Sequence, residues 1–189
     1  MSVVSNVNVY GIDESIKASK YPMSVDISQC DSTVTDRVKS LGHAATGSGH
    51  DNFLNGIVVQ FDLTFSLKAW PEAQRYNFLN FVSSQSTVHR ITKLNPYKQC
   101  NKYVLESIKD TMVELVSMYN ENPTPENYLI VLYNIPTGFE LTARMTTNYR
   151  QLKTIYFQRK SHKLPEWREF CHWIETLPMF KELILDENV

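Results

Sequence analysis

The sequence predicts an α+β fold in which an antiparallel sheet of mixed strand order, built from long strands, packs against long helices. Two segments predict the sheet, because apolar and polar residues alternate over 57–68 and again over 139–145. A period of two places one set of side chains on each face of a strand. The helices are predicted by residues 102–119, where apolar side chains recur at helical spacing.

Length and composition are those of a globular domain. A chain of 189 residues has the usual size of one domain. The 42% hydrophobic and 21% charged fractions allow an apolar core. We therefore expect a single α+β domain over residues 1–189. Residues 1–45 are weakly patterned, with short helices expected over 13–20 and 35–41, and we expect this variable N-terminal segment to pack on the core.

Composition also argues against several classes of protein. No apolar run reaches the roughly 20 residues that a membrane span needs, and residues 1–10 lack the pattern of a secretory signal. Cys30, Cys100 and Cys171 are widely separated and odd in number, which indicates free thiols in a reducing cytoplasm. A net charge of −1 argues against a broad basic surface for a nucleic-acid polymer.

The first half of the chain is expected to pass from loop to strand to helix. Residues 43–55 are rich in glycine, serine and asparagine, which is typical of a loop. The strand over 57–68 should turn its apolar set toward the core. Pro71 suits the first turn of a helix predicted over 72–81. The polar run 83–87 follows that helix.

The second half is expected to contain a hairpin. The two prolines within 122–125 should end the helix over 102–119. An apolar strand is predicted over 128–133, followed by a turn at 135–138. The connection to the alternating strand 139–145 is too short for a parallel crossover, so these two strands should be antiparallel.

Two helices are expected after this hairpin. Thr147 is a suitable N-cap for a helix over 148–160. Another helix should begin near Leu164 and carry aromatic residues at helical spacing. Pro178 should end it, and residues 180–185 should add a last turn.

Cationic side chains gather in this helical region. Between residues 144 and 168 only Glu166 opposes a set of basic residues, namely Arg144, Arg150, Lys153, Arg159, Lys160, Lys163 and Arg168. Eleven residues make about three helical turns, so Asn148 and Arg159 fall near one stripe. Guanidinium groups bind phosphate through paired hydrogen bonds, which makes an anion site one interpretation. The alternative is that Arg150 and Arg159 solvate a helix face.

No arrangement of residues predicts independent acid–base, nucleophilic or metal chemistry. His50 follows Gly47-Ser48-Gly49, which is neither a P-loop nor a dinucleotide fingerprint. His43, His89 and His172 lack the spacing of metal ligands. The residues alone therefore predict no catalytic side chain and no metal ligand.

The order of motifs resembles that of the flavin-dependent thymidylate synthases. In that family a Gly-His pair precedes a long strand, and an Arg-His-Arg-x-x-Ser-x-Asn-Glu-x-Ser-x-Arg signature follows the next helix. Here Gly49-His50 precedes the strand over 57–68. With the signature aligned on its end, Ser83 and Arg90 match it, and Gln85 takes the place of the asparagine.

The second half of the family pattern can be aligned with this sequence without a gap. The family has a Leu-Pro turn, a strand, an Asn-x-Arg-x-Leu pattern, a further arginine, and a His/Gln-Trp-Glu segment. The corresponding residues here are Ile135-Pro136, Asn148-Tyr149-Arg150-Gln151-Leu152, Arg159, and then His162, Glu166 and Trp167.

The signature also departs from the family pattern. Phe78, Leu79 and Asn80 stand where Arg-His-Arg is expected, whereas an alternative alignment places Arg75-Tyr76-Asn77 there. Ser86 replaces the glutamate. Val88 replaces a serine implicated in placing the nucleotide base, and an isopropyl group cannot form a hydrogen bond.

The resemblance implies a flavoenzyme of cytoplasmic nucleotide biosynthesis. FAD, with NADPH and methylenetetrahydrofolate as co-substrates, would serve methyl transfer to C5 of dUMP, while the protein binds and orients. The implied nucleotide contacts are Ser83, Gln85, Ser86, Arg90 and Arg159. The implied flavin contacts are His50, Arg75, Asn148, Arg150 and His162. The family assembles as homotetramers with sites shared between subunits, and no nucleic-acid or membrane partner is expected.

Two alternatives remain open at this stage. A homologue that lost Arg-His-Arg and the signature serine would bind a nucleotide without turnover. An unrelated interaction or structural protein would instead use exposed aromatic side chains as an interface, and the candidates are Tyr156, Phe157, Trp167 and Trp173.

Overall fold

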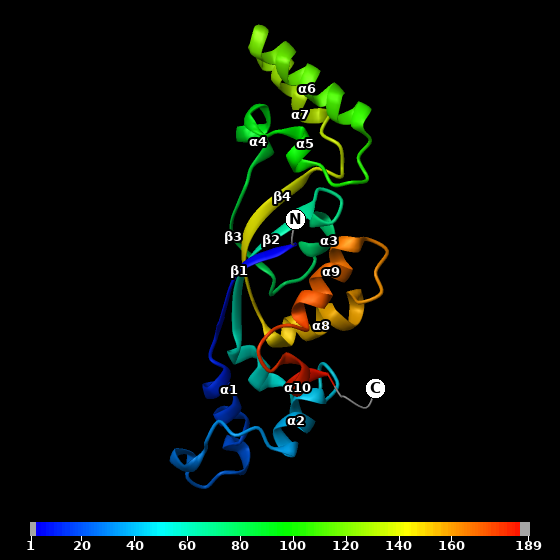
Figure 1. Ribbon diagram of the computed structural model, residues 1–189. Helices are drawn as coiled ribbons and strands as arrows, with labels where there is room; N and C mark the ends of the chain where they lie inside the picture. Colours follow the sequence, from blue (N-terminus) through cyan, green and yellow to red (C-terminus); the bar gives the residue numbers. More distant parts are fainter. Residues whose placement is uncertain (1–2, 186–189) are drawn as a thin grey trace.

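The computed structural model describes residues 3–185, and an antiparallel sheet forms its centre (Figure 1). The strands are β1 (Val4–Tyr10), β2 (Val58–Ser66), β3 (Asn80–Ser84) and β4 (Glu140–Asn148). Their order across the sheet is β1-β2-β4-β3, so strands that are neighbours in the sheet are not always neighbours in sequence. The predicted α+β class with an antiparallel sheet of mixed order is confirmed.

The two central strands carry the alternating pattern that the sequence shows. β2 and β4 pair along their whole length, from Val58 opposite Asn148 to Ser66 opposite Glu140. On β2 the side chains of Val59, Phe61, Leu63 and Phe65 are buried, and the polar residues between them are only partly buried. The period-two interpretation of this segment is therefore confirmed.

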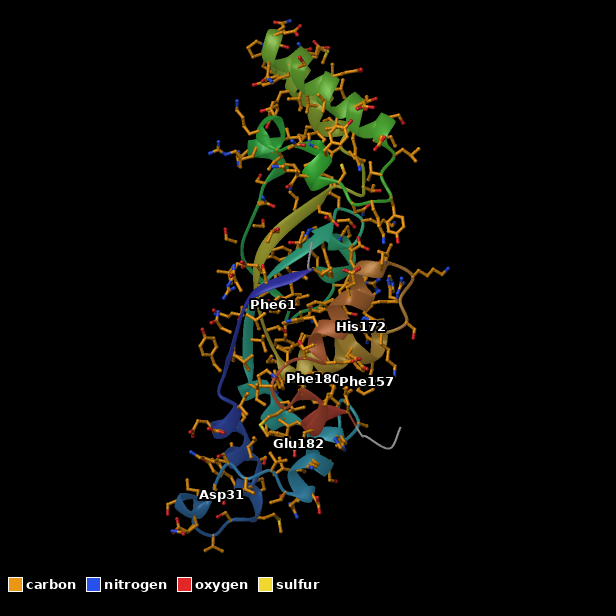
Figure 2. The ribbon with its side chains drawn as sticks, viewed as in Figure 1. Asp31, Phe61, Phe157, His172, Phe180 and Glu182 are labelled. Carbon is orange, nitrogen blue, oxygen red and sulfur yellow. The ribbon has the colours of Figure 1, made fainter. Side chains whose placement is uncertain are left out.

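Three helices cover one face of the sheet, and Figure 1 shows them along a single side. They are α8 (Tyr149–Arg159), α9 (Pro165–Ile174) and α10 (Phe180–Ile184). Aromatic rings fill the interface: the ring centroids of Phe61 and Trp173 are 4.7 Å apart, and those of Phe65 and Trp167 are 4.9 Å apart. Figure 2 labels Phe61 on the sheet and Phe180 on α10, two residues of this core.

Smaller elements extend the molecule at both ends of the sheet (Figure 1). At one end lie α1 (Ile12–Ser19), α2 (Asp36–His43) and the 3-10 turns η1 (Tyr21–Met23), η2 (Ile27–Gln29) and η3 (Asn52–Gly56). At the other end lie α4 (Thr87–Arg90), η4 (Ile91–Lys93), α5 (Pro96–Gln99), α6 (Glu106–Glu121) and α7 (Pro125–Tyr133). The short α3 (Trp70–Ala73) follows β2. The elements beyond β3 share a second apolar cluster around Met112, Val131 and Phe139.

The predicted strand over 128–133 is wrong, because these residues belong to α7. Thr124 caps the helix by accepting a hydrogen bond from the backbone N–H of Asn127, and Pro125 occupies the first turn. A short apolar run does not distinguish a strand from a partly buried helix by periodicity alone. The predicted hairpin is absent from the described residues, and the antiparallel partners of β4 are β2 and β3.

The predicted helix over 72–81 is also wrong over most of its length. α3 ends at Ala73, and the chain then becomes β3, an edge strand whose residues are all exposed. Pairing with β4 makes this segment a strand, and such pairing leaves little trace in the local sequence. β1 is likewise mostly exposed, which explains why residues 1–45 look weakly patterned.

Other element boundaries differ by a few residues. α6 begins at Glu106 and not at residue 102. The N-cap of α8 is Asn148 and not Thr147, since the Asn148 side chain accepts a hydrogen bond of 2.9 Å from the N–H of Gln151. Helices near 13–20, 35–41 and 164–174 are confirmed as α1, α2 and α9.

The three thiols differ in exposure, and this predicts their reactivity. Cys100 and Cys171 are buried, whereas Cys30 is partly exposed. Burial raises the pKa of the Cys171 thiol to about 12, so very little of the reactive thiolate exists at pH 8. We expect a thiol reagent at pH 8 to label Cys30 rapidly and the other two only after unfolding. Rapid labelling of Cys171 in the folded protein, detected by peptide mapping, would contradict this packing.

Candidate functional site

A polar cleft of about 400 Å³ lies between α8 and the segment that joins α3 to β3. Its lining residues are Arg75, Tyr76, Asn77 and Phe78 from the segment, and Gln151, Thr154, Gln158 and Arg159 from the helix. Gln151, Thr154 and Gln158 are three or four positions apart and therefore share one face of α8, and Arg159 follows directly after them. The cleft therefore brings together two guanidinium groups, those of Arg75 and Arg159, from separate parts of the chain.

Arg159 is held in a defined orientation at the end of α8. Its Nε donates a hydrogen bond of 2.8 Å to the hydroxyl of Tyr76, and its Nη1 donates one of 2.6 Å to Oε2 of Glu72. The guanidinium carbon lies 4.8 Å from the ring centroid of Trp167, which is fully buried. Arginine has five N–H donors, so part of its fork remains available to a ligand.

A chain of hydrogen bonds supports this arginine. The Tyr76 hydroxyl donates to Oε1 of Gln158 at 2.9 Å. Nδ1 of His162 accepts a hydrogen bond of 3.2 Å from the N–H of Leu164, which assigns the ring proton of the neutral imidazole to Nε2. That Nε2 lies 3.2 Å from Oε2 of Glu72. The carboxylate of Glu72 is therefore shared between Arg159 and His162.

The guanidinium group of Arg75, in contrast, is available to a ligand. Its side chain is exposed and has no ion pair or hydrogen bond with any residue of 3–185. An unpaired guanidinium beside an oriented one is an arrangement suited to binding an anion such as phosphate. Neither arginine is a nucleophile or a general base, so the chemistry that this cleft offers by itself is binding and orientation.

A buried charge cluster joins the loop around His50 to α8. Asp51 is fully buried, and its carboxylate accepts hydrogen bonds from Nε of Arg150 at 3.0 Å and from Nζ of Lys153 at 3.1 Å. The Lys153 ammonium also donates to the carbonyl oxygens of Gly42 at 2.8 Å and Ala44 at 2.5 Å. Arg150 thus anchors the loop, and His50 is exposed beside this anchor.

Besides His162, two more of the predicted flavin contacts have structural partners in this chain. Asn148 caps α8, and Arg150 pairs with Asp51. Each of these side chains retains further hydrogen-bond donors, so a ligand contact at either position stays a prediction.

The predicted nucleotide contacts in the polar run lie at the edge of the sheet. Gln85 is tied to Thr142 twice, since its backbone N–H donates to the carbonyl of Thr142 and its Oε1 accepts from the N–H of Thr142, both at 2.9 Å. Ser83 is in β3, Ser86 precedes α4, and Arg90 is the exposed last residue of α4. The residues that line the Arg75–Arg159 cleft do not include these four, so within one chain Arg90 does not share that cleft with Arg159.

Sequence reasoning missed four residues that organise these sites. Glu72 and Tyr76 orient Arg159, and Asp51 and Lys153 fix the loop to α8. Tyr76 and its neighbours Arg75 and Asn77 do occur in the alternative alignment of the family signature, and the structure places that segment beside Arg159. The spacing of the other three carries no motif that would reveal their partners.

The described part of the chain adds two further findings. No group of three or more histidine, cysteine, aspartate or glutamate side chains within it is arranged to hold a metal ion. None of the helices between residues 3 and 185 combines the length and the apolar character that crossing a bilayer would require.

The fold, with the strand order β1-β2-β4-β3 and with α8, α9 and α10 on one face of the sheet, is similar to that of a flavin-dependent thymidylate synthase. Two solved structures of the enzyme ThyX from Helicobacter pylori, both with FAD and dUMP, are similar over nearly the whole chain. One has a TM-score of 0.71 and 16% sequence identity, and covers 97% of this chain and 99% of its own. The other, at 2.31 Å resolution, has a TM-score of 0.74 and 15% identity, with coverages of 97% and 98%.

The likeness to ThyX lies in the fold and not in close sequence similarity. The sequence matches no protein-family model and no curated protein. At 15–16% identity the likeness shows a ThyX-like fold, and the fold expected from the order of motifs is confirmed.

Proposed function

We propose that this protein binds a pyrimidine nucleotide and FAD and catalyses a flavin-dependent modification of the base, resembling methyl transfer to C5 of dUMP. The observation that carries the proposal is the meeting of Arg75 and Arg159 in one polar cleft. It is supported by the fold, because the H. pylori ThyX structures of that fold contain FAD and dUMP.

The donors in the cleft fit a phosphate-bearing ligand. The guanidinium group of Arg75 is available to a ligand. Arg159 keeps some of its N–H donors free, while Tyr76 and Trp167 hold its side chain in place. A volume of about 400 Å³ is at the small end of the range for ligand pockets, so a dinucleotide would extend beyond the cleft. In the homotetramer that the resemblance implies, the partly exposed Ser86 and the exposed Arg90 would complete the site of a neighbouring subunit.

The chain's own residues would bind the nucleotide and the flavin and orient them relative to each other. FAD, when bound, would supply the hydride chemistry that protein side chains lack. Arg75 and Arg159 would neutralise a phosphate. The fixed position of Arg159 would define where the attached sugar and base lie, because a bidentate guanidinium contact restrains direction as well as distance. His50, Asn148, Arg150 and His162 remain the proposed flavin contacts, with Arg150 acting through the loop that Asp51 anchors. Arg75, which the resemblance implies as a flavin contact, is proposed here to bind the phosphate beside Arg159 because both line one cleft.

The test combines a spectrum with an assay. We expect protein incubated with FAD and then desalted to keep the flavin absorbance band, and we expect dUMP to stimulate its oxidation of NADPH when methylenetetrahydrofolate is present. Protein that retains no FAD and shows no calorimetric heat with dUMP would overturn the proposal.

A second candidate function is nucleotide binding without turnover. It is favoured by the exposed apolar side chain of Phe78 in the cleft and by Val88, an exposed residue whose side chain cannot form a hydrogen bond. This candidate predicts a calorimetric signal with dUMP and no NADPH oxidation under any of the above conditions. The third reading, an aromatic interface, loses much of its basis because Trp167 and Tyr156 are core residues.

A further inference from the structure

One amide side chain of the cleft has a fixed orientation. Gln158 lines the cleft beside Arg159. Nε of Arg159 donates a hydrogen bond of 2.8 Å to the Tyr76 hydroxyl, and this hydroxyl donates one of 2.9 Å to Oε1 of Gln158. A guanidinium group can only donate and a hydroxyl has a single proton, so the relay directs the amide oxygen of Gln158 toward Tyr76. The Nε2 amino group has no hydrogen-bond partner within residues 3–185 and stays available to a ligand.

The other amides that line the cleft lack such a constraint. No hydrogen bond to another residue of the described chain holds the side-chain amide of Asn77 or that of Gln151. Each of these two can turn either its carbonyl oxygen or its amino group toward a ligand. Gln158, in contrast, offers donors only. A ligand group that meets it gains a hydrogen bond if it is an acceptor and none if it is a donor.

We propose that Gln158 is a specificity-determining residue whose amino group donates a hydrogen bond to the C4 carbonyl of the pyrimidine, so that the cleft prefers a uracil nucleotide over a cytosine nucleotide. The inference rests on the proposed function, since it assigns base recognition to the same cleft. A pyrimidine of the uracil and thymine type has an acceptor oxygen at C4, whereas cytosine has an amino donor there.

The chemistry of the donors assigns the phosphate to the arginines and the base to Gln158. Charged guanidinium donors form stronger hydrogen bonds to phosphate than a neutral amide does, and Arg75 and Arg159 supply them. The Gln158 amide is linked to Arg159 through one hydroxyl group, so it lies near the phosphate site without belonging to it. The C2 carbonyl of a nucleotide adjoins the glycosidic bond, which leaves the C4 position as the more accessible edge of the ring.

The nucleotides dUMP and dCMP are matched probes, because they carry the same sugar and phosphate. We expect calorimetry at pH 8, with FAD in the buffer, to show that the wild-type protein binds dUMP roughly 3- to 10-fold more tightly, the size of one neutral hydrogen bond. Gln158→Leu should bring this ratio close to one. Gln158→Glu should reverse it in favour of dCMP, because a carboxylate accepts from an amino group and cannot donate to a carbonyl.

The ratio of the two affinities isolates base recognition, since a change in phosphate binding affects both nucleotides equally. Gln158 is exposed, so we expect both variants to keep the wild-type melting temperature. Gln29→Glu adds the same charge at an exposed position of η2 outside the cleft, and it should keep the wild-type ratio.

Three results would overturn this inference and leave the proposed function intact. The first is a wild-type protein that binds dUMP and dCMP equally or prefers dCMP. The second is a wild-type ratio retained by Gln158→Glu. The third is a parallel loss of both nucleotides in Gln158→Leu with an unchanged ratio, which would assign the amide to the phosphate. A wild-type protein that binds neither nucleotide would count against the proposed function itself.

Discussion

Replacing Lys153 with methionine is expected to lower the free energy of unfolding by about 3–5 kcal/mol. The Lys153 side chain is 4% exposed and that of Asp51 is 0% exposed. Methionine keeps most of the volume but removes the charge, so Asp51 would be left buried with Arg150 as its only ionic partner among residues 3–185. The carbonyl oxygens of Gly42 and Ala44, buried and partly buried respectively, would also lose the ammonium as a donor.

Urea unfolding followed by circular dichroism measures this effect. Lys181→Met, an exposed position on α10, provides the matched control and should change stability by less than about 0.5 kcal/mol. The double variant Asp51→Asn/Lys153→Met should recover part of the loss, because the buried carboxylate that has lost one of its two cations is then gone. A Lys153→Met protein as stable as the control would mean that the cluster does not exist in the folded chain.

Replacing Arg159 with alanine is expected to weaken nucleotide binding by about 1.5–3 kcal/mol, the usual range for a hydrogen bond to a charged group. This is roughly a 10- to 150-fold rise in the dissociation constant for dUMP measured by calorimetry. The reason is that Arg159 is the guanidinium that the cleft holds in place, with Tyr76 on Nε and Glu72 on Nη1.

Two further variants distinguish the specific loss of the Arg159 contact from the loss of any surface arginine. Arg37→Ala removes an exposed arginine on α2 and should leave binding unchanged. Tyr76→Phe removes only the hydroxyl that accepts from Arg159, so it should cost about 0.5–1.5 kcal/mol of binding, less than the loss of the arginine itself. An Arg159→Ala protein that binds dUMP with wild-type affinity would remove this residue from the site.

The sequence was informative where one segment's own pattern decides its structure. The alternation along β2 reflects a strand with one buried face, and that signal is complete within the strand itself. The aromatic residues of α9 recur at helical spacing because that helix buries one stripe, which includes Trp167 and Phe170. The order of several short motifs was enough to suggest the fold that the comparison with ThyX confirms.

The sequence was uninformative where distant partners decide. α7 and β3 were assigned wrongly, because their conformations depend on packing against α6 and on pairing with β4. The ionic partners were missed for the same reason: Asp51 and Lys153 are 102 residues apart, and Glu72 and Arg159 are 87 apart. No local period records such a contact.

By itself, therefore, the sequence determined the antiparallel α+β class, the central strand β2 and the helices that follow β4. Only the tertiary structure decided which of several arginines face a cleft, which are anchored by a buried carboxylate, and which remain unpaired. The physical reason is that hydrophobic periodicity can be read from the sequence of a single helix or strand. The environment of a charged side chain, in contrast, depends on which other elements pack beside it, and these lie far away in the sequence.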